Sequence, residues 1–234
     1  MKKGFLLLVV LTVVFSASAQ SDSPAISPWY LDISLGIVQS KLSGSEVDFM
    51  QSIVTSHRDG ELKMKSRTGI GLDFLARRRL GNHFHLKSGL QYVQRGASLE
   101  NTGYVQKPYP SAEYLGVPFI IGVTTGSYGN EKAFGLYLNG GMAYLLNVAD
   151  NSTWVTKTHS VLDIVIETGV EIALSRTVSL GLNYKLMKDL NKAHTFSRQY
   201  SDGTGNLNLR REYDYYYTTQ TFSASLRVNV GKNG

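Results

Sequence analysis

Apolar and polar residues alternate along about eight stretches of this sequence between Trp29 and Gly231. The clearest stretch runs from Leu162 to Leu174, where one set of alternate residues is apolar apart from Thr168 and the other set includes three carboxylates. Because successive side chains of a β-strand point to opposite faces, this stretch predicts a strand with one apolar and one charged face. The same alternation predicts strands at 30–39, 66–77, 83–97, 112–124, 133–148, 162–174, 178–190 and 215–231.

The connections between these stretches are alternately long and short. An up-and-down barrel that begins in the periplasm has this pattern, with tight periplasmic turns and long outer loops. A Greek-key sandwich has no reason to produce so regular an alternation. The expected short turns are 78–82, 125–132 and 175–177, and the expected long loops are 40–65, 98–111, 149–160 and 191–214.

The N-terminus has the three parts of a secretory signal peptide. Two lysines at residues 2–3 form the basic start, residues 5–15 the apolar core, and Ala-Ser-Ala at 17–19 the cleavage site. The apolar run is too short to span a bilayer as a helix, which takes about 20 residues. We therefore predict a cleaved signal peptide at 1–19, a short N-terminal segment at 20–28 and one domain at 29–234.

Composition narrows the choice of protein class. The chain has no cysteine, which excludes disulfides and thiol chemistry. Its formal net charge of +6 is spread along the sequence, so we expect no nucleic-acid partner. No long apolar stretch follows the signal, which argues against a helical membrane protein. A β-barrel fits, because half of its strand residues face inward and can be polar.

These observations predict an all-β protein in the bacterial outer membrane. Its fold would be a single eight-stranded, antiparallel, up-and-down transmembrane β-barrel of OmpA/OmpX-like size, with apolar residues toward lipid and polar residues inside. Pro118 lies within one predicted strand and cannot donate a ladder hydrogen bond, so we expect a bulge or a local break there.

Four segments resemble a known family. They are Trp-Tyr-Leu-Asp-Ile-Ser-Leu-Gly at 29–36, Glu-Tyr-Leu-Gly-Val-Pro at 113–118, Leu-Tyr-Leu-Asn-Gly-Gly at 136–141 and Ser-Leu-Gly-Leu-Asn-Tyr at 179–184. Together with the signal ending in Ala-Gln, they resemble the PorT-like outer-membrane β-barrel proteins of Bacteroidetes. The resemblance covers nearly all of the chain after the signal and implies an eight-stranded outer-membrane barrel. The best-known branch of that family assists type IX protein secretion.

Charged residues on the predicted inward faces are the first candidate site. Eight strands leave an interior just wide enough for side chains, so opposite charges there should pair. We expect Glu167 and Glu171 to meet Lys185 on the neighbouring strand, with Arg227 within reach. A salt-bridged plug is favoured over an ion path because of the barrel's size. The predicted interior network comprises Asp32, Asp73, Lys87, Arg95, Asp163, Glu167, Glu171, Lys185 and Arg227.

Catalytic and metal sites have weaker support, and we predict no catalytic residue, cofactor or metal. The carboxylates of Glu167 and Glu171 are four residues apart on one strand, about 13 Å, which is too far for an acid–base pair. His83 and His85 share a strand face without an identifiable third ligand. The alternative is a lipid-modifying enzyme that would draw on loop residues His57, Asp59, His159, Ser160 and His194, although no Gly-x-Ser-x-Gly elbow occurs.

The long loops are the remaining candidates for function, because binding residues concentrate on loops held by a rigid scaffold. Candidate contacts for a protein or glycan partner are Arg198, Tyr200, Arg210, Arg211 and Tyr213. We expect a monomer surrounded by outer-membrane lipid that has a structural or interaction role or assists secretion. A second alternative is a soluble exported barrel that binds a small ligand inside an apolar interior.

Overall fold

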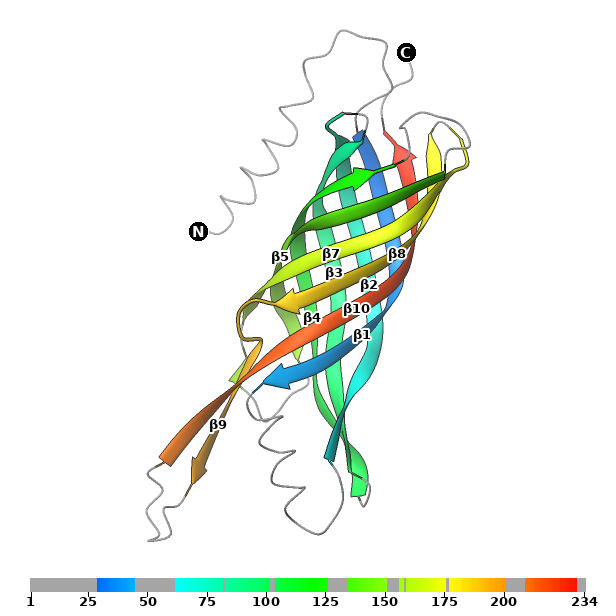
Figure 1. The fold of residues 1–234 in the computed structure, drawn as a ribbon. Coiled ribbons are helices and arrows are strands. Elements are labelled where there is room, and N and C mark those ends of the chain that lie inside the picture. Colours follow the sequence, from blue (N-terminus) through cyan, green and yellow to red (C-terminus); the bar gives the residue numbers. More distant parts are fainter. Residues whose placement is uncertain are drawn as a thin grey trace, which may run out of the picture.

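The computed structural model describes residues 29–44, 62–81, 83–101, 104–125, 134–150, 156–157, 159–175, 177–200 and 209–230. These residues form one antiparallel sheet that closes on itself (Figure 1). Among them, no helix is long and apolar enough to cross a membrane. The strands are β1 (Trp29–Gly44), β2 (Leu62–Arg79), β3 (Phe84–Asn101), β4 (Tyr104–Thr124), β5 (Phe134–Asp150), β6 (Thr156–Lys157), β7 (Ser160–Ala173), β8 (Val178–Asp189), β9 (His194–Tyr200) and β10 (Leu209–Asn229).

Eight of these strands form the barrel, in the order β1-β2-β3-β4-β5-β7-β8-β10, and β10 pairs back with β1. Each strand pairs with the next barrel strand in the chain, so the predicted up-and-down fold is confirmed. Following paired residues once around the wall from Leu31 leads back to β1 at Lys41, ten residues further on. A stagger of this kind accompanies a strand tilt of about 35–45°, and Figure 1 shows strongly inclined strands.

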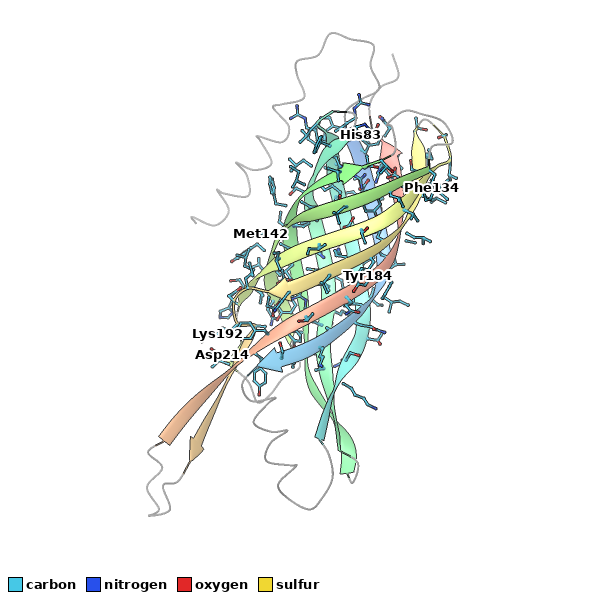
Figure 2. The ribbon with its side chains drawn as sticks, in the orientation of Figure 1. His83, Phe134, Met142, Tyr184, Lys192 and Asp214 are labelled. Carbon is cyan, nitrogen blue, oxygen red and sulfur yellow. The ribbon has the colours of Figure 1, made fainter. Side chains whose placement is uncertain are left out.

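Side chains along the wall follow the predicted alternation. On β7, outward Leu162, Ile164 and Ile166 are exposed, whereas inward Asp163 and Glu167 are buried. Figure 2 shows Met142 and Tyr184 on the wall between the two ends of the barrel. An apolar exterior around a charged interior is the reverse of a lipocalin-like barrel, so the alternative of an apolar ligand-binding interior does not fit.

The two ends of the barrel differ in how the strands connect. At one end, which we call the turn end, Leu80 donates a backbone hydrogen bond to Phe84 and Leu174 donates one to Val178, which closes tight turns. Val230 donates to Trp29 at this end, so the first and last barrel strands begin and finish side by side. We call the opposite end the rim end. His83 and Phe134 lie at the turn end, and Lys192 and Asp214 toward the rim end (Figure 2).

The prediction of long loops at the rim end was wrong in part, because strands continue there beyond the barrel. The expected loop 98–111 belongs largely to β3 and β4, which pair as far as Asn101 and Tyr104. The expected loop 191–214 contains β9, which pairs with β10, and β6 pairs with β9. Backbone N–H and C=O groups of neighbouring strands can keep pairing beyond the part of the barrel where outward side chains must be apolar. The strands therefore extend into segments that lack the apolar alternation.

An irregularity interrupts the wall between β2 and β3. The β2–β3 register shifts between Ser66 and Gly71, which forms a bulge. Side chains satisfy the displaced backbone groups. Inside the barrel, the Ser40 hydroxyl accepts from Gly96 N at 2.6 Å, and on the outside the Gln94 side-chain oxygen accepts from Ile70 N at 3.2 Å.

Pro118 produces a local break without a bulge. On one side it remains in register with Ala143 of β5. On the other side, the β3–β4 ladder stops after Ser88 pairs with Phe119 and resumes where Gln91 pairs with Gly116, in the same register. The expectation of a local break is confirmed, because proline has no N–H to offer β3.

Candidate functional sites in the lumen and at the rim

Six charged side chains meet in the half of the lumen nearer the turn end, and three are acidic and three basic. We call them the turn-side cluster. Asp32 of β1 is at its centre and bonds Arg77 at 2.6 Å and Arg227 at 2.9 Å, with Lys87 at 4.0 Å. One carboxylate thus contacts cations from three other strands. The cluster comprises Asp32, Arg77, Lys87, Glu167, Glu171 and Arg227.

The two glutamates of β7 complete the cluster. Glu167 accepts from Lys87 at 2.6 Å and from the Asn139 amide at 2.9 Å. Glu171 pairs with Arg227 and lies 3.8 Å from Arg77. All six side chains are at most 15 % exposed, and their charges cancel. A buried charge is costly unless it is paired, so this balance allows the layer to exist inside the barrel.

Gly122 makes room for a hydrogen-bonded chain that extends this layer. His85 bonds Asn139 at 2.9 Å, and Asn139 in turn donates to Glu167. A Cβ at Gly122 would collide with the Asn139 side-chain oxygen and crowd the His85 ring. The ring of Tyr137 completes the packing, with Arg77 and Lys87 5.9 and 5.7 Å from its centroid.

A second, smaller group lies closer to the rim end, and we call it the rim-side cluster. Arg95 of β3 pairs with Asp163 of β7 and bonds Asp189 of β8 at 2.7 Å. The two aspartates are direct partners in the β7–β8 register. Asp189 also accepts from Tyr217 N at 2.6 Å. Arg95 lies 5.3 Å from the Tyr114 ring centroid, so a single guanidinium and an aromatic wall hold two buried carboxylates together.

The expected pairing of Lys185 was wrong. Lys185 is opposite Glu167 in the register, yet its amine bonds Asp73 of β2 at 2.5 Å. Asp73 also accepts from the Ser34 hydroxyl at 3.0 Å. Lys87 forms the ion pair with Glu167 instead. Inward side chains of a small barrel can contact partners across the lumen as well as partners on the neighbouring strand.

The structure places all nine residues of the predicted network inside the barrel. The prediction left out Arg77, His85, Asn139 and Asp189, which are also buried partners. The signal for Asp189 was present in the sequence, because it has the same parity as inward Lys185 on β8. His83 and His85 do not act together: His83 is exposed ahead of β3 and its ring lies 3.0 Å from the Thr124 carbonyl oxygen.

The candidate contacts of the last loop fall on β9 and on the part of β10 that pairs with it, which we call the β9–β10 extension. Arg211 pairs with Arg198 and Leu209 with Tyr200 along the β9–β10 ladder. Tyr213 pairs with Phe196 in the same ladder. The candidates at this extension are Arg198, Tyr200, Arg210, Arg211 and Tyr213.

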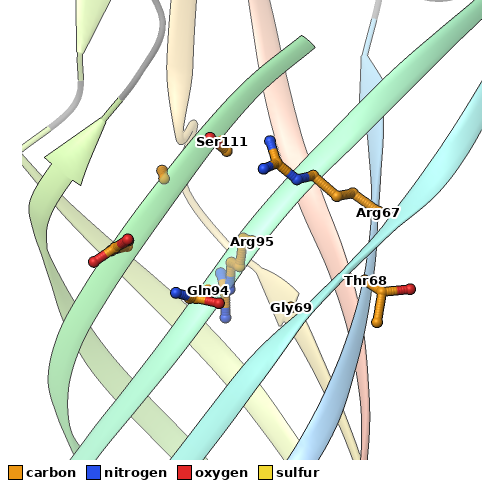
Figure 3. Close-up of a pocket in the computed structure, with 8 residues that line it drawn as sticks. Arg67, Thr68, Gly69, Gln94, Arg95 and Ser111 are labelled. Carbon is orange, nitrogen blue, oxygen red and sulfur yellow. The ribbon is translucent and has the colours of Figure 1, made fainter. Parts of the chain in front are cut away.

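A small polar cleft opens in the wall at the β2 bulge, with a volume of about 90 Å³. Figure 3 shows Arg67 reaching from β2 toward Ser111 of β4, with Gln94 of β3 below them in this view. Next to it, the Tyr92 hydroxyl donates to Glu113 at 2.9 Å and accepts from Gln94 at 3.0 Å. The cleft is lined by Arg67, Thr68, Gly69, Gln94, Arg95, Ser111, Ala112 and Glu113.

The loop residues considered for catalysis do not form a recognisable constellation in the part of the chain that the structure describes. His57 and Asp59 lie outside the described residues. His159 is exposed, and no hydrogen bond joins its side chain to that of Ser160. His194 begins β9, where its backbone pairs with Lys157. Within the same part of the chain, no group of three His, Cys, Asp or Glu residues is arranged to hold a metal.

Comparison with known proteins identifies the fold independently. The family model described as outer membrane protein beta-barrel domain matches residues 7–229. Similar solved structures include OprG from Pseudomonas aeruginosa, with a TM-score of 0.51 and 11% identity over 89% of this chain and 100% of that chain. Neisserial surface protein A has a TM-score of 0.44 and 13% identity over 87% and 97% of the two chains. The comparison with curated protein sequences finds no match.

Proposed function

Because the chain belongs to the outer membrane protein beta-barrel domain family, we propose that it is a closed, non-conducting barrel that acts as an interaction protein at the cell surface. In this proposal the turn end faces the periplasm and the rim end faces the exterior. A Sec signal peptide is cleaved before Gln20. The β9–β10 extension presents the contact residues for a protein or glycan partner.

The ion-paired lumen is the observation that supports this proposal most strongly. Asp32 holds three cations at one level, and Arg95 holds two carboxylates at another. An ion entering the lumen would have to separate buried pairs, which costs several kcal/mol for each charge left unpaired. The interior of an eight-stranded barrel is filled by such side chains, whereas barrels of 16–18 strands leave an aqueous channel.

The extension of β10 supports the interaction role. It continues past the barrel as a β-ladder with β9, so residues 209–214 are carried on a hydrogen-bonded scaffold. Arg198 and Arg211 are backbone partners in this ladder, and Arg210 is next to Arg211 in the sequence, so the extension is rich in basic residues. An anionic partner would suit these charges, such as an acidic glycan or an acidic protein surface.

Purified protein in a planar bilayer is expected to show no steady conductance, because the paired charges occupy the lumen. The measurement is single-channel recording after insertion, verified on a gel where the unheated barrel migrates faster than the heated chain. A variant that lacks four charges of the turn-side cluster, in which Asp32, Arg77, Lys87 and Glu167 are all replaced by Ser, provides the comparison. Steady conductance in the unmodified protein would reject the plug.

Replacing residues 196–213 with a two-residue Asn-Gly turn is expected to abolish partner binding and leave the barrel folded. Among the described residues, β10 is the one barrel strand with which β9 pairs. Removing β9 therefore leaves the pairing of the other barrel strands intact. Binding of the folded protein to a panel of acidic and neutral glycans is the readout, with the heat-dependent gel shift as the folding control. If the replacement left binding unchanged, the β9–β10 extension would not be the binding site.

A role in protein secretion is the finer proposal, and it rests on the PorT-like sequence segments at 29–36, 113–118, 136–141 and 179–184. Deleting the gene and measuring the proteins released into the medium tests it. Unchanged release, with the barrel confirmed in the outer-membrane fraction of the parent strain, would leave the interaction role without a secretion function.

A further inference from the structure

On β1 and β2 the outward face of the wall changes from apolar to polar residues toward the rim end, whereas at the end of β8 the exposed Leu190 follows Lys188. On β1 the exposed apolar residues end at Ile37, and Gln39 and Lys41 follow. On β2 they end at Ile70, beyond which lie Thr68 and Arg67. An outward apolar band of a transmembrane barrel marks the hydrocarbon layer. The polar residues that follow therefore lie at the level of lipid headgroups.

Cations gather at this level on neighbouring strands. Lys188 of β8, Lys41 of β1, and Lys65 and Arg67 of β2 are all exposed, and β10 lies between β8 and β1. Thr218 of β10 pairs with Lys188 on one side and Lys41 on the other. Two strand spacings separate the backbones at Lys188 and Lys41, about 10 Å. We call Lys41, Arg67 and Lys188 the cationic arc.

The cationic arc lacks internal charge compensation. Among the described residues, no ion pair involves Lys41, Arg67 or Lys188. The nearest outward carboxylate along β10 is Asp214, which lies further toward the rim and bonds Lys192 at 3.3 Å. Glu113 also lines the adjoining cleft, where its carboxylate accepts a hydrogen bond from the Tyr92 hydroxyl. Grouped exposed cations attract a polyvalent anion, because each contact alone contributes little in water.

The cleft at the β2 bulge continues the arc. Arg67 belongs to both, and the cleft adds the side chains of Thr68, Gln94 and Ser111 as hydrogen-bonding groups. Just on the membrane side of it, Tyr92 and Leu115 return the wall to an apolar surface. A ligand with phosphates, sugar hydroxyls and acyl chains would meet cations, polar groups and an apolar wall in that order.

We propose that the cationic arc and the adjoining cleft bind a phosphorylated glycolipid of the outer leaflet, of the lipid A class. This inference rests on the proposed orientation, with the rim end outside. The phosphates would contact Lys41, Arg67 and Lys188, the sugar would lie at the cleft, and the acyl chains would cover the apolar band below. A glycerophospholipid carries one phosphate per headgroup and no disaccharide, so it would engage the arc less completely.

The test uses the full chain folded in phosphatidylcholine nanodiscs and titrated with diphosphorylated lipid A, with bound lipid counted by native mass spectrometry. The triple variant Lys41→Ser, Arg67→Ser, Lys188→Ser is expected to bind lipid A about tenfold more weakly, from the loss of three exposed charge contacts. The matched control is Arg79→Ser, Lys132→Ser, Arg176→Ser, which removes the same charge from residues in or beside the segments 78–82, 125–132 and 175–177, which the sequence predicts to be short turns, and should bind as the unmodified protein does.

Two further arms identify the ligand. Dephosphorylated lipid A should bind about as weakly to the unmodified protein as lipid A binds to the triple variant. Phosphatidylglycerol should also bind weakly, and binding as strong as that of lipid A would overturn the glycolipid assignment. Equal lipid A binding by the triple variant and the unmodified protein would overturn the site itself. Protease cleavage of the β9–β10 extension on intact cells tests the orientation separately. Cleavage shows that the rim end faces outside, so a wrong orientation can be distinguished from a wrong lipid-binding site.

Discussion

Replacing Arg95 with Met should lower the free energy of unfolding by about 3–5 kcal/mol, the largest loss we expect from a single substitution in this barrel. Arg95 is the cation that Asp163 and Asp189 share, and both aspartates are almost fully buried. Without it, two carboxylates would face each other across adjacent strands with no countercharge. Urea unfolding in detergent micelles, followed by the heat-dependent gel shift, measures the change.

A compensating variant separates the charge effect from lost packing. Arg95→Met combined with Asp163→Asn and Asp189→Asn removes the whole charged group and should recover most of the lost stability, because replacing a complete buried set is close to neutral. Lys188→Met, which removes an exposed cation, is the control and should change stability by less than about 1 kcal/mol. If the compensated variant were as unstable as Arg95→Met, the guanidinium's role would be packing between the Tyr114 and Tyr217 rings.

Asp32→Asn is expected to have the second-largest effect, about 3 kcal/mol of lost stability. It would leave Arg77, Lys87 and Arg227 with two carboxylates in place of three. The same urea titration applies, and Asn is chosen because it keeps the shape of the side chain.

Asp73→Asn is the matched comparison for Asp32→Asn. Asp73 is also an inward aspartate, but it holds a single cation, Lys185, together with the Ser34 hydroxyl. Asp73→Asn should therefore lower the free energy of unfolding by clearly less than Asp32→Asn does. Equal losses from the two substitutions would mean that the turn-side cluster contributes no more than an isolated pair, which would contradict a cooperative layer.

The alternation of residue types was enough to predict the barrel wall. In the clearest case, residues 162–174, side chains of one parity are exposed and apolar and those of the other include buried Asp163 and Glu167. The alternation predicts the strands well because outward side chains that contact lipid must be apolar. Beyond the band this requirement ends, and so the pattern did not predict β9 or the ends of β3 and β4.

The partners of the inward charges could not be predicted in the same way. The register places Glu167 opposite Lys185, and a reading along the wall would pair them. In the folded barrel, Lys87 reaches Glu167 from β3, and Lys185 reaches Asp73 on β2. Those contacts cross the lumen between strands that are not adjacent.

The sequence by itself determined that this chain forms an eight-stranded barrel with apolar residues outside and charges inside, because a strand's two-residue period ties each position to one face. The tertiary structure alone decided how those charges divide into the turn-side and rim-side clusters. It also decided that Lys41, Arg67 and Lys188 lie together on the outer wall. Both depend on the register of the closed barrel, whose stagger advances ten residues in one circuit and brings residues distant in sequence next to one another.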